Sequence, residues 1–216
     1  MIRFFDLLFS FVLLILLFPL LLLVSLWNVL TGEHEIFYTQ TRIGKNGKQF
    51  EILKFATMLK NSSEFGAGGF TEFNDSRFLP LGSFMRKTKI NELPQLLNVL
   101  RGEMSLVGFR PLTKVSFDKA LEIVDKSTYS VIPGITSLAM VCLPNEEQVL
   151  MKIEDKQIYY EEHILPFKVQ LDKWWAKNNS LFNYFAILFL TLLSLCLPFR
   201  LLPIKILKDL PEIRLF

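Results

Sequence analysis

Two long stretches without charge dominate the pattern of hydrophobic and polar positions along the chain. The first, residues 7–30, would as a helix be long enough to cross about 30 Å of hydrocarbon. Pro19 lies near its middle and removes one hydrogen bond from the helical ladder, so a bend is expected there. Two geometries remain open: a kinked helix that spans the membrane, or a re-entrant helix that enters one leaflet and returns. Positive charges on both flanks, at Arg3 and Arg42, favour keeping both flanks cytoplasmic.

Residues 178–199 form the second uncharged stretch, and apolar residues are interleaved with Lys and Arg in the tail from Arg200 to Phe216. The stretch is consistent with a membrane span, an interfacial helix or a cover over the core, and the tail is typical of an interfacial segment. The sequence therefore predicts three parts: a membrane helix over 1–32, a globular domain over 33–177, and an apolar membrane-associated end over 178–216.

Short segments early in the globular part predict a β-hairpin. Residues 35–41 and 49–55 have the composition of strands, and the turn-forming residues 42–47 separate them. Residues 61–76 are rich in Ser, Gly, Asn and Asp and predict a loop. The GAGG at 66–69 within it lacks the spacing of a dinucleotide-binding motif.

A helical period begins just after this region. Four leucines recur at the spacing of one helix face, which predicts that this face is buried: Leu93, Leu96, Leu97 and Leu100. Asn91 is a favourable N-cap, Pro94 is tolerated in the first turn, and Arg101-Gly102 ends the helix. A second, mostly helical region is predicted from about 145 to 176.

Composition agrees with a membrane-associated protein that carries one globular domain. Of the 216 residues, 51% are hydrophobic and 21% are charged, and the mean hydropathy of +0.35 is too high for an ordinary soluble domain. The part between the apolar ends is long enough for one core and too short for two. The cysteines and histidines are too isolated for a disulfide framework or a zinc site, which fits a reducing compartment: Cys142, Cys196, His34 and His163.

The net charge of +3 is less informative than its distribution. Basic residues gather in the front half of the globular part: Arg42, Lys45, Lys48, Lys54, Lys60, Arg77, Arg86, Lys87, Lys89 and Arg101. Next to a membrane segment, this distribution indicates either contact with anionic headgroups or phosphates, or a solvated charged face.

Several longer motifs are specific enough to suggest a family. They are RFFDLLFS at 3–10, FYTQTRIGKNGKQFEILKFATM at 37–58, RKTKINELPQLLNVLRGEMSLVGFRPL at 86–112, PGIT at 133–136 and YYEEHILPFKVQLDKWW at 159–175. Together they resemble the bacterial sugar transferases known as monotopic phosphoglycosyl transferases, and the 86–112 block is the strongest part of the match.

The resemblance implies an α+β, mostly α fold: a monotopic membrane protein with a re-entrant, Pro-broken N-terminal helix and a small α-rich catalytic domain that contains a short β-hairpin. It also implies one reaction, in which a sugar-1-phosphate passes from a UDP-sugar to polyprenyl (undecaprenyl) phosphate with release of UMP and a requirement for Mg²⁺. The expected setting is the cytoplasmic face of the bacterial inner membrane, at the first membrane step of surface glycan or exopolysaccharide assembly. Membrane lipid is an expected partner, a homodimer is allowed, and nucleic acid is not expected.

The family's chemistry uses an Asp-Glu pair at the start of the helix described above, and here the pair reads Asn91-Glu92. The resemblance implies catalytic roles for Glu92, Asn91 and Arg110, with Mg²⁺ held at Glu92. It implies substrate contacts from a wider set: Lys54, Arg77, Arg86, Lys87, Gln95 and Pro111. Further departures from the family are Ala56 in place of Arg, Phe109 in place of Pro, and Phe18 in place of the Ser that precedes the helix-breaking proline.

An amide is a poor nucleophile, so Asn91 puts the family's two-step route through a covalent phosphosugar in question. Two hypotheses follow. The chain is an active transferase of altered chemistry, in which polyprenyl phosphate attacks the UDP-sugar directly or another carboxylate such as Glu103 takes over. Alternatively, it is a catalytically silent membrane-bound relative that acts as a donor- or lipid-binding partner protein.

Overall fold

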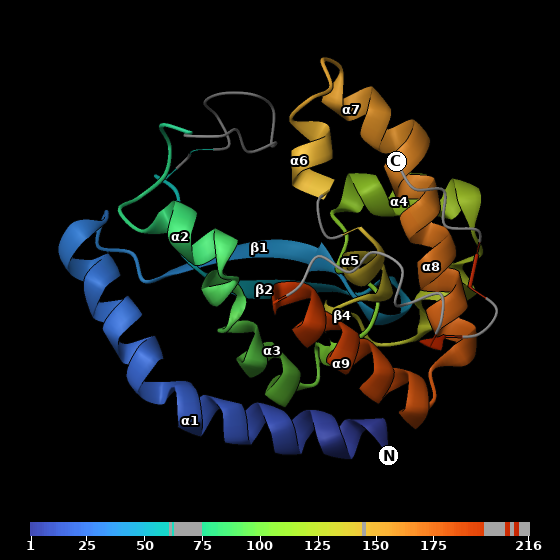
Figure 1. Cartoon of the computed structure of the whole chain (residues 1–216), viewed down its shortest axis with the longest axis horizontal. Helices are drawn as coiled ribbons and strands as arrows, with labels where there is room; N and C mark the ends of the chain where they lie inside the picture. Colours follow the sequence, from blue (N-terminus) through green and yellow to red (C-terminus); the bar gives the residue numbers. More distant parts are fainter. Residues whose placement is uncertain (61, 63–74, 144–145, 197–205, 208–209, 212–216) are drawn as a thin grey trace.

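The computed structural model describes residues 1–60, 62, 75–143, 146–196, 206–207 and 210–211. Most of the loop predicted over 61–76, including its GAGG, lies outside the described residues, and so does most of the tail beyond Arg200. The described part is mostly helical and contains two small sheets (Figure 1). A mostly helical α+β fold with a short hairpin is therefore confirmed.

The helices fall into a long N-terminal element and a series of shorter ones. They are α1 (Ile2–Thr31), α2 (Gly82–Lys87), α3 (Gln95–Arg101), α4 (Lys114–Ile123), α5 (Leu138–Cys142), α6 (Glu146–Leu150), α7 (Lys156–Tyr159), α8 (Leu165–Asn178) and α9 (Leu181–Cys196). Single tighter turns of 3-10 helix cover Lys45–Gly47, Ile90–Glu92 and Lys126–Ser130, and one π-helical turn, Tyr160–Ile164, joins α7 to α8. The predicted helical region over 145–176 is confirmed in the residues that are described.

The predicted hairpin is also confirmed. Strands β1 (Phe37–Ile43) and β2 (Gln49–Phe55) pair antiparallel, from Phe37 opposite Phe55 to Ile43 opposite Gln49. The turn between them uses Asn46 and Gly47, both with positive φ. The hairpin runs through the middle of the molecule (Figure 1), and β2 packs against α3 and the turn that precedes it.

The second sheet pairs two short strands that lie on either side of α4 in the chain. Strands β3 (Ser105–Val107) and β4 (Gly134–Thr136) pair parallel, and α4 lies in the crossover between them. Gly134 permits this pairing, because a Cβ there would lie 2.0 Å from the backbone nitrogen of Gly108. The glycine of the PGIT motif is thus explained by close backbone approach.

The start and face of α3 differ from the prediction. The helix begins at Gln95, its capping residue Pro94 makes no side-chain cap, and Asn91 lies in the separate 3-10 turn before it. The prediction of Asn91 as the N-cap is therefore wrong, because Lys89 adopts a left-handed conformation (φ 60) that begins a short turn instead. The buried face carries Leu96 and polar residues, whereas the other three leucines of the predicted stripe are only partly buried: Leu93, Leu97 and Leu100. Gly102 ends the helix with φ 87, as predicted.

Helix α1 is one continuous helix that turns about halfway along its length (Figure 1). Pro19 lies inside it. Among the described residues α1 is the one helix long and apolar enough to cross a membrane, and most of its apolar side chains are exposed. The large exposed ones include Phe4, Phe11, Ile15, Leu16, Phe18, Leu22, Leu23, Leu26 and Leu30.

Two polar side chains attach the first turns of α1 to the globular part. Arg3 donates to the carbonyl oxygen of Val99 at 2.7 Å, at the end of α3. The carboxylate of Asp6, only 1% exposed, accepts hydrogen bonds from the hydroxyls of Ser105 at 2.9 Å and Tyr184 at 2.8 Å. These bonds join α1, β3 and α9 at a single buried acid.

The far end of α1 is attached as well. The buried Asn28 side chain donates from Nδ2 to the carbonyl oxygen of Ala56 at 3.0 Å, directly after β2. Ala56 is itself buried and donates its backbone N–H to Ile36 at 3.0 Å. Both ends of α1 therefore contact the same globular part, whereas its middle carries the exposed apolar surface.

Candidate active site

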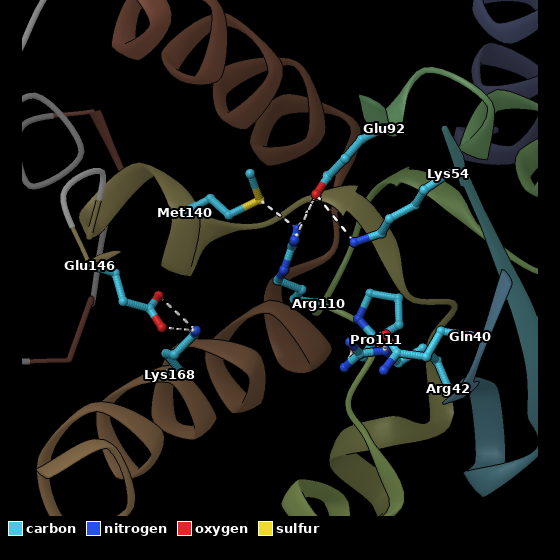
Figure 2. A network of polar contacts seen from close by, with 9 residues as sticks. All are labelled: Gln40, Arg42, Lys54, Glu92, Arg110, Pro111, Met140, Glu146 and Lys168. Carbon is cyan, nitrogen blue, oxygen red and sulfur yellow. Dashed lines mark hydrogen bonds and ion pairs between the residues drawn. The ribbon is translucent and has the colours of Figure 1, made fainter. Parts of the chain in front are cut away.

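Glu92 is the centre of a buried charge cluster built from three separate segments. It ends the 3-10 turn before α3 and is 7% exposed. Arg110, in the loop after β3, donates from Nη2 to Glu92 Oε1 at 2.8 Å, and Lys54 of β2 lies with its Nζ 3.5 Å from the same oxygen. Figure 2 shows both cations converging on the Glu92 carboxylate. The fold thus brings together residues 38 and 18 positions apart in sequence.

The protonation of this cluster follows from its burial and charge. Burial alone would raise the pKa of Glu92, but Arg110 and Lys54 outweigh it and hold that pKa well below its usual range. Burial lowers the pKa of Lys54 to about 8, and the opposing charge of Glu92 limits the fall. Glu92 is therefore ionised near neutral pH, while Lys54 is close to its titration point.

Two neutral side chains beside Glu92 have unsatisfied polar atoms. Asn91 is 8% exposed, and its buried Oδ1 has no hydrogen-bond partner among the described residues. Gln95 is 1% exposed, and its Nε2 is likewise without a partner in the described part of the chain. Buried polar atoms of this kind are rare in folded proteins and point to a ligand or water in the functional state.

A cavity of about 200 Å³ adjoins the cluster on the side of Arg110. Cations line it at Arg42, Arg110 and Lys168, and the carboxyl groups of Glu146 and Asp172 face it as well. The remaining lining is hydroxyl-bearing or apolar: Pro111, Leu112, Thr113, Ser116, Ala139, Tyr160 and Leu165. Figure 2 shows the paired Lys168 and Glu146 opposite Arg110.

Arg42 connects the hairpin to this cavity. Its guanidinium donates to Gln40 Oε1 at 2.5 Å and to the carbonyl oxygen of Pro111 at 3.5 Å (Figure 2). Burial and the nearby Arg110 charge lower its pKa. The cavity lining thus contains two neighbouring guanidiniums, those of Arg42 and Arg110, and this arrangement favours an anionic ligand.

The predicted substrate-contacting residues divide into two groups. Lys54 contacts Glu92, Pro111 lines the cavity, and Gln95 is buried one turn beyond Glu92. The other three lie in or just before α2. Lys87 is exposed, and the Arg86 guanidinium packs over the Phe78 ring, 5.6 Å from its centroid. Arg77 forms an ion pair with Asp75 at 2.6 Å.

The carboxylate suggested as an alternative nucleophile lies at the wrong end of α3. Glu103 follows the helix, whereas Glu92 precedes it, and Glu103 accepts a hydrogen bond from Asn98 Nδ2 at 2.7 Å. Its role is to tie the end of α3 to the hairpin, because the same Asn98 amide also donates to the carbonyl oxygen of Glu51 at 2.8 Å. This placement argues against Glu103 as a nucleophile in the Glu92 cluster.

Sequence reasoning missed the residues on the far wall of the cavity. Asp172, Lys168 and Glu146 come from α8 and α6, where charged residues occur at many positions without any distinguishing motif. The signal that was available is the spacing of Leu165, Lys168 and Asp172, which places them on one face of α8.

Phe109, which departs from the family's proline, is fully buried and packs edge-on against Tyr129, with ring centroids 4.9 Å apart. Both belong to a core cluster with Phe117, Leu165 and Val169. The substitution at position 109 therefore fills a core behind the cavity and adds no polar group to it.

The family described as bacterial sugar transferase matches residues 1–197. A Haemophilus influenzae protein named uncharacterized sugar transferase is 37% identical over 192 residues, which cover 82% of this chain and 37% of the relative. The undecaprenyl-phosphate galactose phosphotransferase of Salmonella typhimurium is 34% identical over 204 residues, 88% of this chain and 39% of that protein. The exopolysaccharide production protein ExoY of Rhizobium meliloti is 32% identical over 212 residues, 90% of this chain and 85% of the relative.

The chain spans less than two-fifths of the length of the Haemophilus and Salmonella relatives, and most of the length of ExoY. In all three comparisons the matched region covers more than four-fifths of the chain itself, including the Glu92 cluster and the cavity beside it. The chain belongs to the bacterial sugar transferase family.

Proposed function

We propose that the chain transfers a sugar-1-phosphate from a UDP-sugar to polyprenyl phosphate and releases UMP. The observation that carries this proposal is the buried Glu92 carboxylate, which forms ion pairs with Arg110 and Lys54. Beside it lies a cavity lined by the guanidiniums of Arg42 and Arg110. The printed names of relatives support it: one is an undecaprenyl-phosphate galactose phosphotransferase and another a UDP-glucose:undecaprenyl-phosphate glucose-1-phosphate transferase. By the same likeness, ExoY's name supports a place in exopolysaccharide assembly.

The proposed chemistry is a direct displacement. An oxygen of the polyprenyl phosphate attacks the sugar-bearing phosphorus of the donor, and the bond from that phosphorus to the bridging oxygen breaks. UMP leaves with the bridging oxygen and the electron pair, so no proton is required for the leaving phosphate. Arg110 and Lys54 neutralise the charge that develops on the phosphoryl oxygens, which is the main requirement of phosphoryl transfer.

Mg²⁺ is part of this proposal. Among the described residues no group of three or more His, Cys, Asp or Glu side chains could hold a metal ion. Mg²⁺ does not need such a group, because one or two protein oxygens with water and substrate phosphates satisfy it. Glu92 and the unpartnered Oδ1 of Asn91 are oxygen donors that fit this pattern. Bound there, the ion would add positive charge for the diphosphate.

We further propose that α1 is re-entrant and that the globular part rests on the cytoplasmic leaflet. The support is the attachment of both ends of α1 to the same globular part, at Asp6 and at Asn28, while the middle of the helix carries exposed apolar side chains. A helix that crossed the membrane fully would place these two ends about 30 Å apart on opposite sides. Membrane lipid is the natural environment of the exposed surface; a homodimer stays a prediction.

The second candidate function is a silent donor- or lipid-binding partner protein. The observation that favours it is Asn91, whose amide stands where the family's aspartate attacks phosphorus. The two functions share the same binding site and differ only in turnover.

UMP release from a panel of UDP-sugars, measured with polyprenyl phosphate and Mg²⁺ in lipid nanodiscs, separates them. The active transferase gives release with the native chain, and Asn91→Ala lowers this release without abolishing it, because the variant loses one oxygen donor for Mg²⁺ while direct attack needs no nucleophile at position 91. The silent protein gives none until Asn91→Asp supplies a carboxylate. Glu92→Gln is expected to abolish release in either background. Absence of release from the native chain across the panel, with the protein folded, would rule out the proposed activity.

A further inference from the structure

Asp172 is a buried acid on the wall of the cavity that the proposed chemistry does not use. Its side chain belongs to a residue only 5% exposed, and it faces the cavity from the middle of α8. It accepts no hydrogen bond and forms no ion pair within the described part of the chain. Lys168, the cation of α8 whose charge acts on Asp172, forms an ion pair with Glu146 at 2.8 Å.

The carboxylate of Asp172 has no hydrogen-bond or ion-pair partner in the described part of the chain, although Lys168 and Tyr129 lie near enough to interact with its charge. Ionised, it offers two oxygens that accept hydrogen bonds and no donor of its own. Leaving such a group buried without donors is costly, and burial raises the pKa of Asp172 to about 7. Buried polar groups are nearly always satisfied, and because Asp172 lines the cavity, hydroxyl donors of a bound ligand can complete its hydrogen bonds.

The charged and polar residues that line the cavity indicate which ligand it would take. Its lining includes the guanidiniums of Arg42 and Arg110, which suit phosphate oxygens, and Asp172 of α8, which suits hydroxyl groups that donate; the other two charged lining residues, Lys168 and Glu146, pair with each other. The volume of about 200 Å³ is below the 300 Å³ or more that encloses a whole drug-sized ligand. One sugar ring therefore fits beside the carboxylate, with its phosphate toward the guanidiniums.

We infer that Asp172 is a specificity-determining residue that accepts hydrogen bonds from the ring hydroxyls of the nucleotide-sugar donor. The inference rests on the proposed function, because it takes the donor to be a UDP-sugar. Two rings of that donor carry suitable hydroxyls, the hexose and the ribose, and the chemistry at Asp172 is the same for both.

Equilibrium binding to the full chain in lipid nanodiscs, without acceptor, tests the inference. The probes are UDP-glucose, UDP-galactose and UMP, the last of which has the ribose alone. Asp172→Asn keeps the shape and removes the charge, and is expected to weaken UDP-sugar binding about 10- to 100-fold, as for loss of a hydrogen bond to a charged group. The matched control is Asp118→Asn, an exposed acid of α4, which should bind all three probes as the native chain does.

The pattern across probes assigns the ring. Weaker UDP-sugar binding with UMP unchanged places the hexose at Asp172, and equal weakening of both places the ribose there. Unchanged binding of every probe by Asp172→Asn, with the native chain binding well, overturns the inference and leaves the proposed function standing. If the native chain binds none of the probes, the proposed function fails and the inference fails with it.

A measurement on the native chain alone covers the case in which the variant does not fold. UDP-sugars that lack single ring hydroxyls, and UMP with a deoxyribose, should include at least one analogue that binds about tenfold or more weakly than its parent, because Asp172 then loses its donor. Equal affinity across the whole series would refute hydroxyl recognition at Asp172.

Discussion

Removing the charge of Glu92 is the most direct perturbation of the cluster. In Glu92→Gln, Arg110 and Lys54 lose the carboxylate that both contact, at 2.8 Å and 3.5 Å. Breaking a buried ion pair from one side costs about 3–5 kcal/mol, and the one-third exposure of the Arg110 side chain places the expectation near the lower limit, about 3 kcal/mol. For a chain of this size that corresponds to a fall in melting temperature of about 6–12 °C.

The loss of stability in Glu92→Gln should also depend on pH. Glu92 is the main charge that supports the protonated form of Lys54, so its removal lowers the pKa of Lys54 below the native value of about 8. A lysine whose folded pKa lies below its unfolded value destabilises the protein while it is charged, and this is relieved as the pH rises. Once the pH passes about 9, Lys54 is largely neutral in both proteins. The difference in stability therefore shrinks toward the part that belongs to Arg110.

Thermal unfolding in nanodiscs between pH 7 and pH 9.5 measures both effects. Glu51→Gln, at an exposed acid of β2, is the control and should change stability by less than about 0.5 kcal/mol. In a double-mutant cycle that combines Glu92→Gln with Lys54→Met, the coupling free energy between the two side chains should lie within about 0.5–3 kcal/mol at pH 7. A Glu92→Gln protein that melts within 2 °C of the native chain, at every pH tested, would contradict the description of Glu92 as the acceptor for two buried cations.

Three further predictions concern Lys54, Asp172 and Asp6. UMP release should fall as the pH rises through about 8, where Lys54 loses its charge, and Lys54→Arg should move this limb of the pH–rate profile upward; an unchanged limb would assign it to another group. Burial raises the pKa of Asp172 from 3.8, its value in an unfolded chain, to about 7 in the native state, so the native state binds the carboxyl proton more tightly than the unfolded state does. The free energy of unfolding that this proton contributes at low pH is therefore lost as the pH rises to 7. Without ligand, Asp172→Asn should therefore be more stable than the native chain above pH 7, by up to about 4 kcal/mol in chemical unfolding, and parallel pH profiles would refute this. Asp6→Ala leaves the Tyr184 hydroxyl and two β3 donors without an acceptor and should cost about 3 kcal/mol or more in thermal unfolding, whereas Asp6→Asn, which keeps one acceptor oxygen, should cost less.

The sequence predicts best where the controlling interactions are local. Strand β2 has the predicted limits because its composition and the Asn46-Gly47 turn act within a few residues. The start of α3 was wrong because Asn91 has good capping chemistry, and only the left-handed Lys89 ahead of it creates a separate turn. A side chain's propensity for a cap does not reveal that the preceding backbone has already turned.

The site depends on contacts that no local pattern encodes. Glu92 and Arg110 were named through the family resemblance, and their convergence with Lys54 requires the β2–α3 and β3 arrangement. Asp172 was missed because an acid on a helix rich in charges is ordinarily solvated, and its burial follows only from packing of α8 against α4 and α5. The same holds for Asp6, an acid in the first turns of the long apolar helix α1, whose side chain is buried.

Asn91 gives the two candidate functions a common physical basis. Three cations act on the one carboxylate of Glu92: Arg42, Lys54 and Arg110. An aspartate at position 91 would offset one of those charges, so the amide leaves the empty site more positive and should strengthen its hold on a diphosphate. Tighter binding of the ground state does not by itself accelerate a reaction, since only interactions that grow in the transition state do so. Asn91 should therefore favour strong donor binding over fast turnover, and whether the chain is a slow transferase or a silent binding protein depends on how well the acceptor phosphate can replace the missing nucleophile.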